Sequence, residues 1–194
     1  MKKILAIFAV AVFSLFGGEA FAQRCLPGMS AVEVRTDMVN GFYTGNSRNC
    51  GYNLGLFYSV IKGDNANTWS FGGEYLQTYK PYGEKGRIPI AQFTGEVGYN
   101  LHIVSDYSQT FHLYGGVSAL GGYETVNWGK QVLKDGATIG ADDAFIYGGA
   151  VTLSADFYLY DHVVLGAHIK ERFVFGNDTG HFLCAYGLHL KYQF

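Results

Sequence analysis

Apolar and polar residues alternate with a period of two along most of the chain beyond its N-terminal region. This period is expected of a β-strand that has one apolar and one polar face. The last segment shows it most clearly, because every second residue there is apolar and the chain ends on such a residue. Its apolar face consists of Tyr186, Leu188, Leu190, Tyr192 and Phe194.

The same alternation predicts seven further strands, of which the first three have the weaker pattern. No segment after the N-terminal region has the 3.6-residue apolar period of an amphipathic helix. An even number of strands suits an antiparallel up-and-down barrel. The eight predicted strands cover residues 31–39, 51–61, 68–78, 91–101, 111–123, 145–159, 163–169 and 186–194.

The connections between these strands alternate in length. The short polar ones are 62–67, 104–109 and 160–162, and the longer ones are 40–50, 79–88 and 125–143. The connection 176–180 is short although it falls on the long side. Short periplasmic turns and longer outer loops are typical of bacterial outer-membrane barrels, so we expect both chain termini in the periplasm.

The N-terminal region has the three parts of a signal peptide. Lys2 and Lys3 precede an apolar stretch over residues 4–16, and Ala20-Phe21-Ala22 matches a cleavage site before Gln23. This stretch is too short for a membrane-anchoring helix, which needs about 20 apolar residues. Lipidation at Cys25 is disfavoured by the large Arg24 before it. We therefore predict a signal peptide over 1–22 and a single outer-membrane β-barrel domain over 23–194.

Composition decides which face of the barrel points outward. Aromatic residues make up 16% of the chain and charged residues only 15%, below the ~25% of an ordinary soluble domain. A soluble lipocalin-like barrel would enclose its apolar face, but these faces are too aromatic and too continuous to fit inside eight strands. The polar faces mix acids with bases, which can pair inside a narrow barrel. The predicted interior charge network comprises Glu33, Arg35, Glu74, Glu96, Glu124, Asp156, Lys170, Arg172 and Lys191.

These patterns predict an all-β protein: an eight-stranded antiparallel up-and-down transmembrane β-barrel in the outer membrane of a Gram-negative bacterium, in contact with its lipid. An alternating last strand that ends in Phe194 resembles the signal by which the barrel-assembly machinery recognises its clients. The alternative is an amphipathic strand that ends in Phe by chance. Eight strands enclose a lumen that side chains fill, so a DNA-conducting pore is not expected.

Candidate chemistry along the chain is sparse. The spacing of Cys25, Cys50 and Cys184 matches no zinc site, and we predict no disulfide, although Cys184 suits Cys50 better than Cys25 does. His168 with Ser154 or Asp156 imitates the residues of lipid-A-editing barrel enzymes, but we expect them at different depths. The sequence therefore predicts no catalytic residue, no metal site and no cofactor.

Several segments, in order along the predicted mature chain, carry a family resemblance. They are Gln23–Met29, Met38–Tyr43, Gly73–Leu76, Arg87–Thr94, Gly122–Gly129, Asp135–Thr138, Phe145–Gly149 and Gly180–Phe182. With them the chain resembles the TraO family, conjugal transfer proteins of Bacteroidetes conjugative transposons. The resemblance implies a non-enzymatic role in DNA transfer at the envelope, with other Tra proteins as partners, and it implies no catalytic residues.

Two other functions stay open. The long connection 125–143 suits a surface binding or adhesion barrel outside any transfer machinery, although Trp128 at its base is better interpreted as an aromatic residue of the membrane interface. A lipid-modifying enzyme is the weaker alternative. A formal net charge of −2 without a basic stripe gives no reason to expect sequence-specific nucleic-acid binding.

Overall fold

The computed structural model describes residues 25–41, 50–63, 65–82, 86–133, 136–177 and 180–194. The predicted signal peptide and its cleavage site between Ala22 and Gln23 lie outside these residues, so their prediction stays untested. No helix in the described part of the chain is long and apolar enough to cross a membrane.

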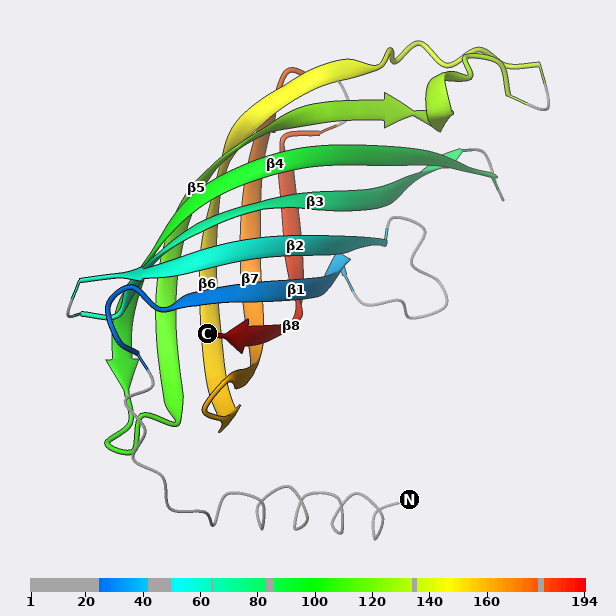
Figure 1. The fold of residues 1–194 in the computed structure, drawn as a ribbon. Coiled ribbons are helices and arrows are strands. Elements are labelled where there is room, and N and C mark those ends of the chain that lie inside the picture. The colour runs from blue at the N-terminus through cyan, green and yellow to red at the C-terminus, as the bar shows by residue number, and fades with distance from the viewer. Residues whose placement is uncertain (1–24, 42–49, 64, 83–85, 134–135, 178–179) are drawn as a thin grey trace, which may run out of the picture.

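The described residues form eight antiparallel strands that close into a barrel, and this confirms the predicted fold class. Each strand pairs with its neighbours in sequence, and β8 closes the barrel against β1 (Figure 1). The elements are β1 (Ser30–Val39), β2 (Gly51–Lys62), β3 (Asn67–Tyr82), β4 (Gly86–Ser105), β5 (Phe111–Val126), the short 3-10 turn η1 (Asn127–Gly129), β6 (Ala144–Tyr160), β7 (Val163–Phe175) and β8 (Phe182–Gln193).

Burial alternates along the strands, with the polar positions inside the barrel. In β1, Glu33 is 2% exposed, whereas its neighbour Val34 is 55% exposed. In β8, His189 is buried between the exposed Leu188 and Leu190. The apolar faces therefore point outward, which is the reverse of a soluble lipocalin-like barrel.

The two ends of the barrel differ in their connections (Figure 1). One end, which we call the turn end, carries the connections 63–66, 106–110 and 161–162 and also the last residue, Phe194. The opposite end, the loop end, carries the connections 40–50, 83–85, 127–143 and 176–181. The alternation of short and long connections is as the sequence predicted, apart from 79–88.

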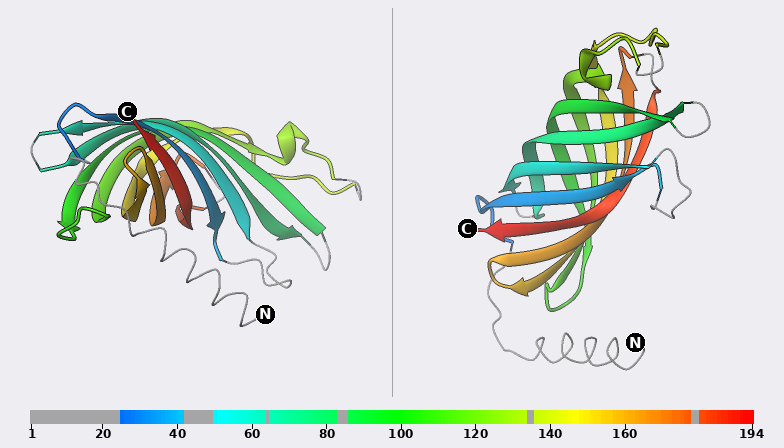
Figure 2. Two further views of the ribbon diagram at one scale, coloured as in Figure 1. Left: turned by 60° about the horizontal axis from the view of Figure 1, so that its bottom comes forward. Right: turned by 90° about the vertical axis from the view of Figure 1, so that its right-hand side faces the viewer.

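The prediction of a loop over residues 79–88 is wrong. β3 continues to Tyr82 and β4 starts at Gly86, with Lys80 opposite Ile88 and Pro81 opposite Arg87. Similarly, β5 extends to Val126, so Thr125 and Val126 belong to the strand rather than to the predicted connection 125–143. As a result β3 to β6 have 16 to 20 residues, against 10 to 13 in the other strands. Figure 2 shows these longer strands projecting beyond β1 and β8 at the loop end.

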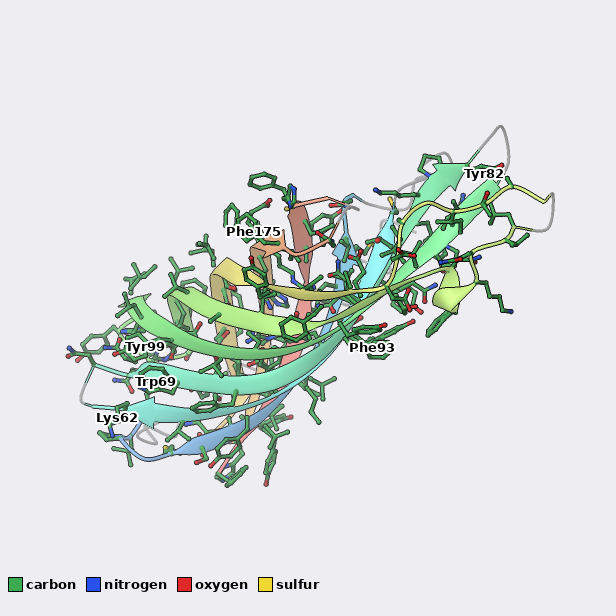
Figure 3. The ribbon with its side chains drawn as sticks, turned by 90° about the horizontal axis from the view of Figure 1, so that it is seen from above. Lys62, Trp69, Tyr82, Phe93, Tyr99 and Phe175 are labelled. Carbon is green, nitrogen blue, oxygen red and sulfur yellow. The ribbon has the colours of Figure 1, made fainter. Side chains whose placement is uncertain are left out.

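Aromatic side chains gather in two belts on the outward face. Near the turn end the ring centroids of Trp69 and Tyr99 are 4.9 Å apart, and toward the loop end those of Tyr75 and Phe93 are 5.0 Å apart. Figure 3 shows Trp69 and Tyr99 close to the Lys62 end of the molecule, with Phe93 nearer to Tyr82. Two such belts around an apolar band are typical of barrels that span a membrane.

Candidate functional site

A cluster of buried charges connects opposite walls of the barrel at mid-height. Lys170 of β7 donates a hydrogen bond to Glu74 of β3 over 2.7 Å and also contacts Glu96 of β4. Arg172, two residues further along β7, donates to the hydroxyl of Thr94 over 3.0 Å. Lys170 and Arg172 are fully buried. Their interactions hold β7 against the strands on the far side of the lumen.

Phe57 of β2 fills the lumen beside this cluster. The guanidinium carbon of Arg35 lies 4.0 Å from the centre of its ring, and the Lys170 ammonium lies 5.6 Å from the same point. Arg35 also donates to Glu33 over 2.6 Å. A ring between two cations gains electrostatic attraction to its π face and leaves little open space in the lumen.

Two imidazoles join two carboxylates in the half of the lumen nearer the turn end. The Nδ1 atoms of His168 and His189 are 3.1 Å apart, and His189 Nε2 lies 2.8 Å from Asp156 Oδ1. His168 Nε2 lies 2.8 Å from Asp37 Oδ1, at an angle outside hydrogen-bond geometry. Lys191 donates to the other oxygen of Asp156 over 2.7 Å. These polar groups therefore contact one another rather than an external ligand.

Buried amides occupy the lumen near the loop end. Gln92 and Asn177 each donate to Glu124 Oε2 over 2.7 Å. Asn177 belongs to the connection between β7 and β8, so this contact anchors that connection over the barrel mouth.

The segment before β1 closes the turn end. The Cys25 thiol lies 3.3 Å from the Tyr158 hydroxyl and 3.9 Å from His112 Nε2. Burial raises the pKa of this thiol, so it stays protonated at neutral pH and is a poor nucleophile. The hollow above it, bounded by Glu33, Asp156 and Lys191 among others, has a volume of about 40 Å³. It has room for only a few water molecules.

The connection between β5 and β6 is folded against its own backbone. Asn127, Trp128 and Gly129 all have positive φ, at 50°, 55° and 74°, a conformation that costs non-glycine residues ~1–2 kcal/mol each. Asp143 supports this left-handed turn by accepting a hydrogen bond from the Val126 N–H over 2.9 Å. Trp128 remains 54% exposed.

The residues of the predicted charge network fall into three groups in the lumen. The first, in the half nearer the turn end, contains Glu33, Asp156 and Lys191. The second, at mid-height, contains Glu74, Glu96, Lys170 and Arg172. Arg35 links the two groups, because it donates to Glu33 and shares the Phe57 ring with Lys170. Glu124 stands apart near the loop end. The sequence did not reveal the contacts of Asp37, Gln92, Asn177 and His189, because each depends on a partner across the lumen or in a connection.

The structure also describes the histidine, cysteine and possible metal-ligating residues considered from the sequence. His168 lies directly opposite Ser154 in the β6–β7 pair, so the expectation that they lie at different depths is wrong. Both residues lie on inward-facing positions, and the partner of Asp156 is His189 instead. Cys25, Cys50 and Cys184 are thiols in the structure. Among the described residues, no group of three or more His, Cys, Asp or Glu side chains is placed to hold a metal ion.

The apolar residues of the last strand point outward. Leu188, Leu190, Tyr192 and Phe194 are between 52% and 57% exposed, and Tyr186 is half-buried on the same face. Sequence reasoning missed a polar residue on this outward surface, Glu171 of β7, which lies opposite Cys184 of β8. The alternation of Leu165, Ala167 and Ile169 continues through it and would have revealed its outward position.

Comparison with protein-family models shows which family the chain belongs to. A family model described as conjugative transposon protein TraO matches residues 26–194, nearly the whole described chain. The chain belongs to the TraO family. This confirms the resemblance carried by the sequence segments, and it makes this TraO protein a member of a family associated with conjugative transposons.

Solved structures similar to this TraO protein are outer-membrane barrels. Neisserial surface protein A has a TM-score of 0.56 at 9% identity, covering 86% of this chain and 96% of that one. The outer membrane protein OprG of Pseudomonas aeruginosa has a TM-score of 0.53 at 13% identity, covering 90% of this chain and 99% of that one. Ail, the attachment invasion locus protein of Yersinia pestis, has a TM-score of 0.51 at 15% identity, covering 87% of this chain and 100% of that one. At these identities the likeness concerns the fold alone. A comparison with curated protein sequences finds no significant match.

Proposed function

We propose that this protein is a non-enzymatic outer-membrane component of a conjugative DNA transfer apparatus. The observation that carries the proposal is the TraO family match over residues 26–194. The closed barrel, with paired charges inside and an apolar surface outside, supports a location in the outer membrane. In this arrangement the turn end lies in the periplasm and the loop end at the cell surface.

Because side chains fill the lumen, we propose that the barrel acts in transfer as a scaffold rather than as a pore. Lys170, Arg172 and Phe57 occupy its middle, and Cys25 with Tyr158 occupies the turn end. Single-stranded DNA has no room to pass between such side chains. We therefore propose that other Tra proteins contact the barrel from outside, and that the barrel-assembly machinery inserts it through its last strand.

A clean in-frame deletion in the donor tests this function. We expect transfer frequency to fall by at least about tenfold and to recover when the full chain is supplied in trans. A matched donor that carries the deletion and an empty vector serves as the control. Unchanged transfer frequency in the deletion strain would remove the proposal.

A surface binding or adhesion barrel is the second candidate, and the folded connection 127–143 favours it. Its left-handed turn keeps the strained Trp128 exposed, and backbone strain of this kind clusters at functional sites. Deletion of residues 130–141 discriminates between the two functions. Lost attachment to recipient cells with normal transfer in forced surface matings supports adhesion, whereas parallel loss of both supports the apparatus.

A lipid-modifying enzyme has less support. His168 contacts His189 and Asp37 inside the lumen, away from the outward face where lipid lies. Expression of the protein should leave lipid A composition unchanged. A new lipid A species that disappears with His168→Ala would revive this candidate.

A further inference from the structure

One carboxylate faces away from the lumen on the surface of β7. Burial alternates along this strand, so the fully buried Lys170 and Arg172 point inward and Glu171 between them points outward. Its outward neighbours along the strand are Ile169 and Phe173. Across the strands it lies opposite Val151 of β6 and Cys184 of β8. The side chain of Glu171 therefore belongs to the apolar outer surface.

The depth of Glu171 places it within the apolar band rather than above it. Phe173 and Phe175 follow it toward the loop end of β7, and Phe182 lies beyond Cys184 on β8. The rings of Phe173 and Phe182 pack edge to face with centroids 5.5 Å apart. Glu171 thus lies on the membrane side of the aromatic belt.

The bonding of Glu171 differs from that of the acids inside the barrel. It lies directly opposite Cys184 of β8, and it makes no ion pair within the described residues. The neighbouring bases, Lys170 and Arg172, are engaged across the lumen with Glu74 and Thr94. Ionisable side chains within a membrane are costly and usually mark a functional contact.

An apolar groove runs across the strands beside this carboxylate. It has a volume of about 740 Å³ and lies between two rows of outward side chains on β5 to β8 and β1. Small residues, Ala155 and Ala167, form its floor, and Ile169 and Tyr186 form the wall next to Glu171 and Cys184. The groove and the carboxylate therefore form one continuous surface.

We propose that this surface binds an apolar segment of a partner protein that carries a Lys or Arg side chain at the level of Glu171. The inference rests on the proposed function, which supplies other transfer proteins as partners. Charge complementarity selects this occupant, because a basic side chain neutralises Glu171 while apolar residues fill the groove. A lipid that bears a phosphate brings like charge to Glu171 and fits this surface less well.

The described strands of a second copy do not provide the required base. The basic residues at outward-facing positions of the described strands are Lys62 and Arg87. Lys62 lies at the turn end (Figure 3), and Arg87 lies opposite Pro81 in the loop-end part of β4. Neither reaches the level of Glu171 when two barrels lie side by side in the same orientation. Because the described strands offer no such base, we assign the complementary cation to a different protein.

Site-specific photo-crosslinking in mating donors tests the surface. The full chain carries a photoreactive benzoyl-phenylalanine in place of Ile169 or, as the control on the opposite wall, in place of Val97 of β4. We expect a protein adduct from the Ile169 position and none from Val97. Mass spectrometry of the adduct should identify a partner peptide that contains Lys or Arg.

Charge substitutions supply the decisive comparison. Glu171→Lys should reduce the adduct at least about tenfold, since it places a like charge against the basic side chain of the partner. Val97→Lys places the same basic side chain on the opposite wall and should leave the adduct unchanged. Heat-modifiable migration on gels verifies that each barrel is folded. If Glu171→Lys does not fold, the isosteric Glu171→Gln replaces it, with a smaller loss expected.

Several results would overturn the interface. They are an adduct of undiminished strength in the charge variant, a crosslinked peptide without a basic residue, a peptide from this chain itself, or crosslinks to lipid alone. Each of these leaves the deletion experiment unaffected, so failure of the interface is distinguishable from failure of the proposed role in transfer.

Discussion

The charged residues on the inner and outer faces of β7 differ in whether the barrel provides them with partners. Inside, Lys170 and Arg172 are fully buried and each contacts a polar partner on the far wall. Outside, Glu171 lies opposite Cys184 of β8 and makes no ion pair within the described part of the chain. This difference indicates that the interior charges stabilise the barrel, because they pair with polar groups across the lumen. For the exterior charge, the described residues supply no cation, which is the basis of the proposed interface.

Removal of the Lys170 ammonium should have the largest effect on stability. Lys170→Met leaves Glu74 and Glu96 buried without their shared cation. Breaking a buried pair in this way typically costs ~3–5 kcal/mol. Urea unfolding of the barrel in lipid vesicles or detergent measures the loss.

The triple variant Lys170→Met, Glu74→Gln, Glu96→Gln is the matched control for this prediction. Because it removes the unpaired charges as well, most of the lost stability should return. A single variant as stable as the wild type would show that the interior charges do not hold the walls together.

Adjacent glycines on β5 provide a second contrast between the faces. A Cβ atom added to the inward-facing Gly122 would lie 1.9 Å from the Phe93 carbonyl oxygen, whereas one on the outward-facing Gly121 would meet nothing closer than 4.0 Å. Gly122→Ala should therefore destabilise the barrel by ~1–3 kcal/mol. Gly121→Ala should stabilise it slightly, by up to about 1 kcal/mol. Equal effects in the same unfolding assay would refute this account of the two faces.

Neutralising the outward carboxylate should have the smallest effect on stability. Glu171→Gln keeps the shape of the side chain and removes a charge from the apolar band, so we expect stability to stay within about 1 kcal/mol of the wild type or to rise. The unfolding midpoint in lipid vesicles measures it. A loss as large as that of Lys170→Met would mean that Glu171 is a structural charge like those in the lumen.

The strands could be predicted from the sequence because each has one apolar and one polar face. The last strand shows this, with Leu188, Leu190 and Tyr192 outward and His189 inward. The prediction failed beyond the apolar band. Residues such as Lys80 and Pro81 break the alternation there, yet the hairpin continues because β3 and β4 still pair through their backbones.

The contacts inside the barrel could be predicted only as a set of charged residues. Which acid meets Lys170 depends on how the strands are staggered around the closed barrel, and the sequence of β7 contains no information about β3 and β4. Glu171 was missed for a different reason. It stands between two interior bases, so the stretch 170–172 has the composition of a polar segment, and only the outward position of Ile169 shows where Glu171 points.

The central claim is that the closed barrel spans the outer membrane with its loop end outside and its turn end in the periplasm. Thiol labelling of intact donor cells tests it directly, in a chain whose Cys25, Cys50 and Cys184 are replaced by Ser. Thr138→Cys in the long connection and Ser108→Cys in the β4–β5 turn are both exposed positions. We expect a membrane-impermeant maleimide to label Thr138→Cys in intact cells, and Ser108→Cys only after the outer membrane is permeabilised. Labelling of Ser108→Cys in intact cells, or protection of Thr138→Cys, would contradict the account.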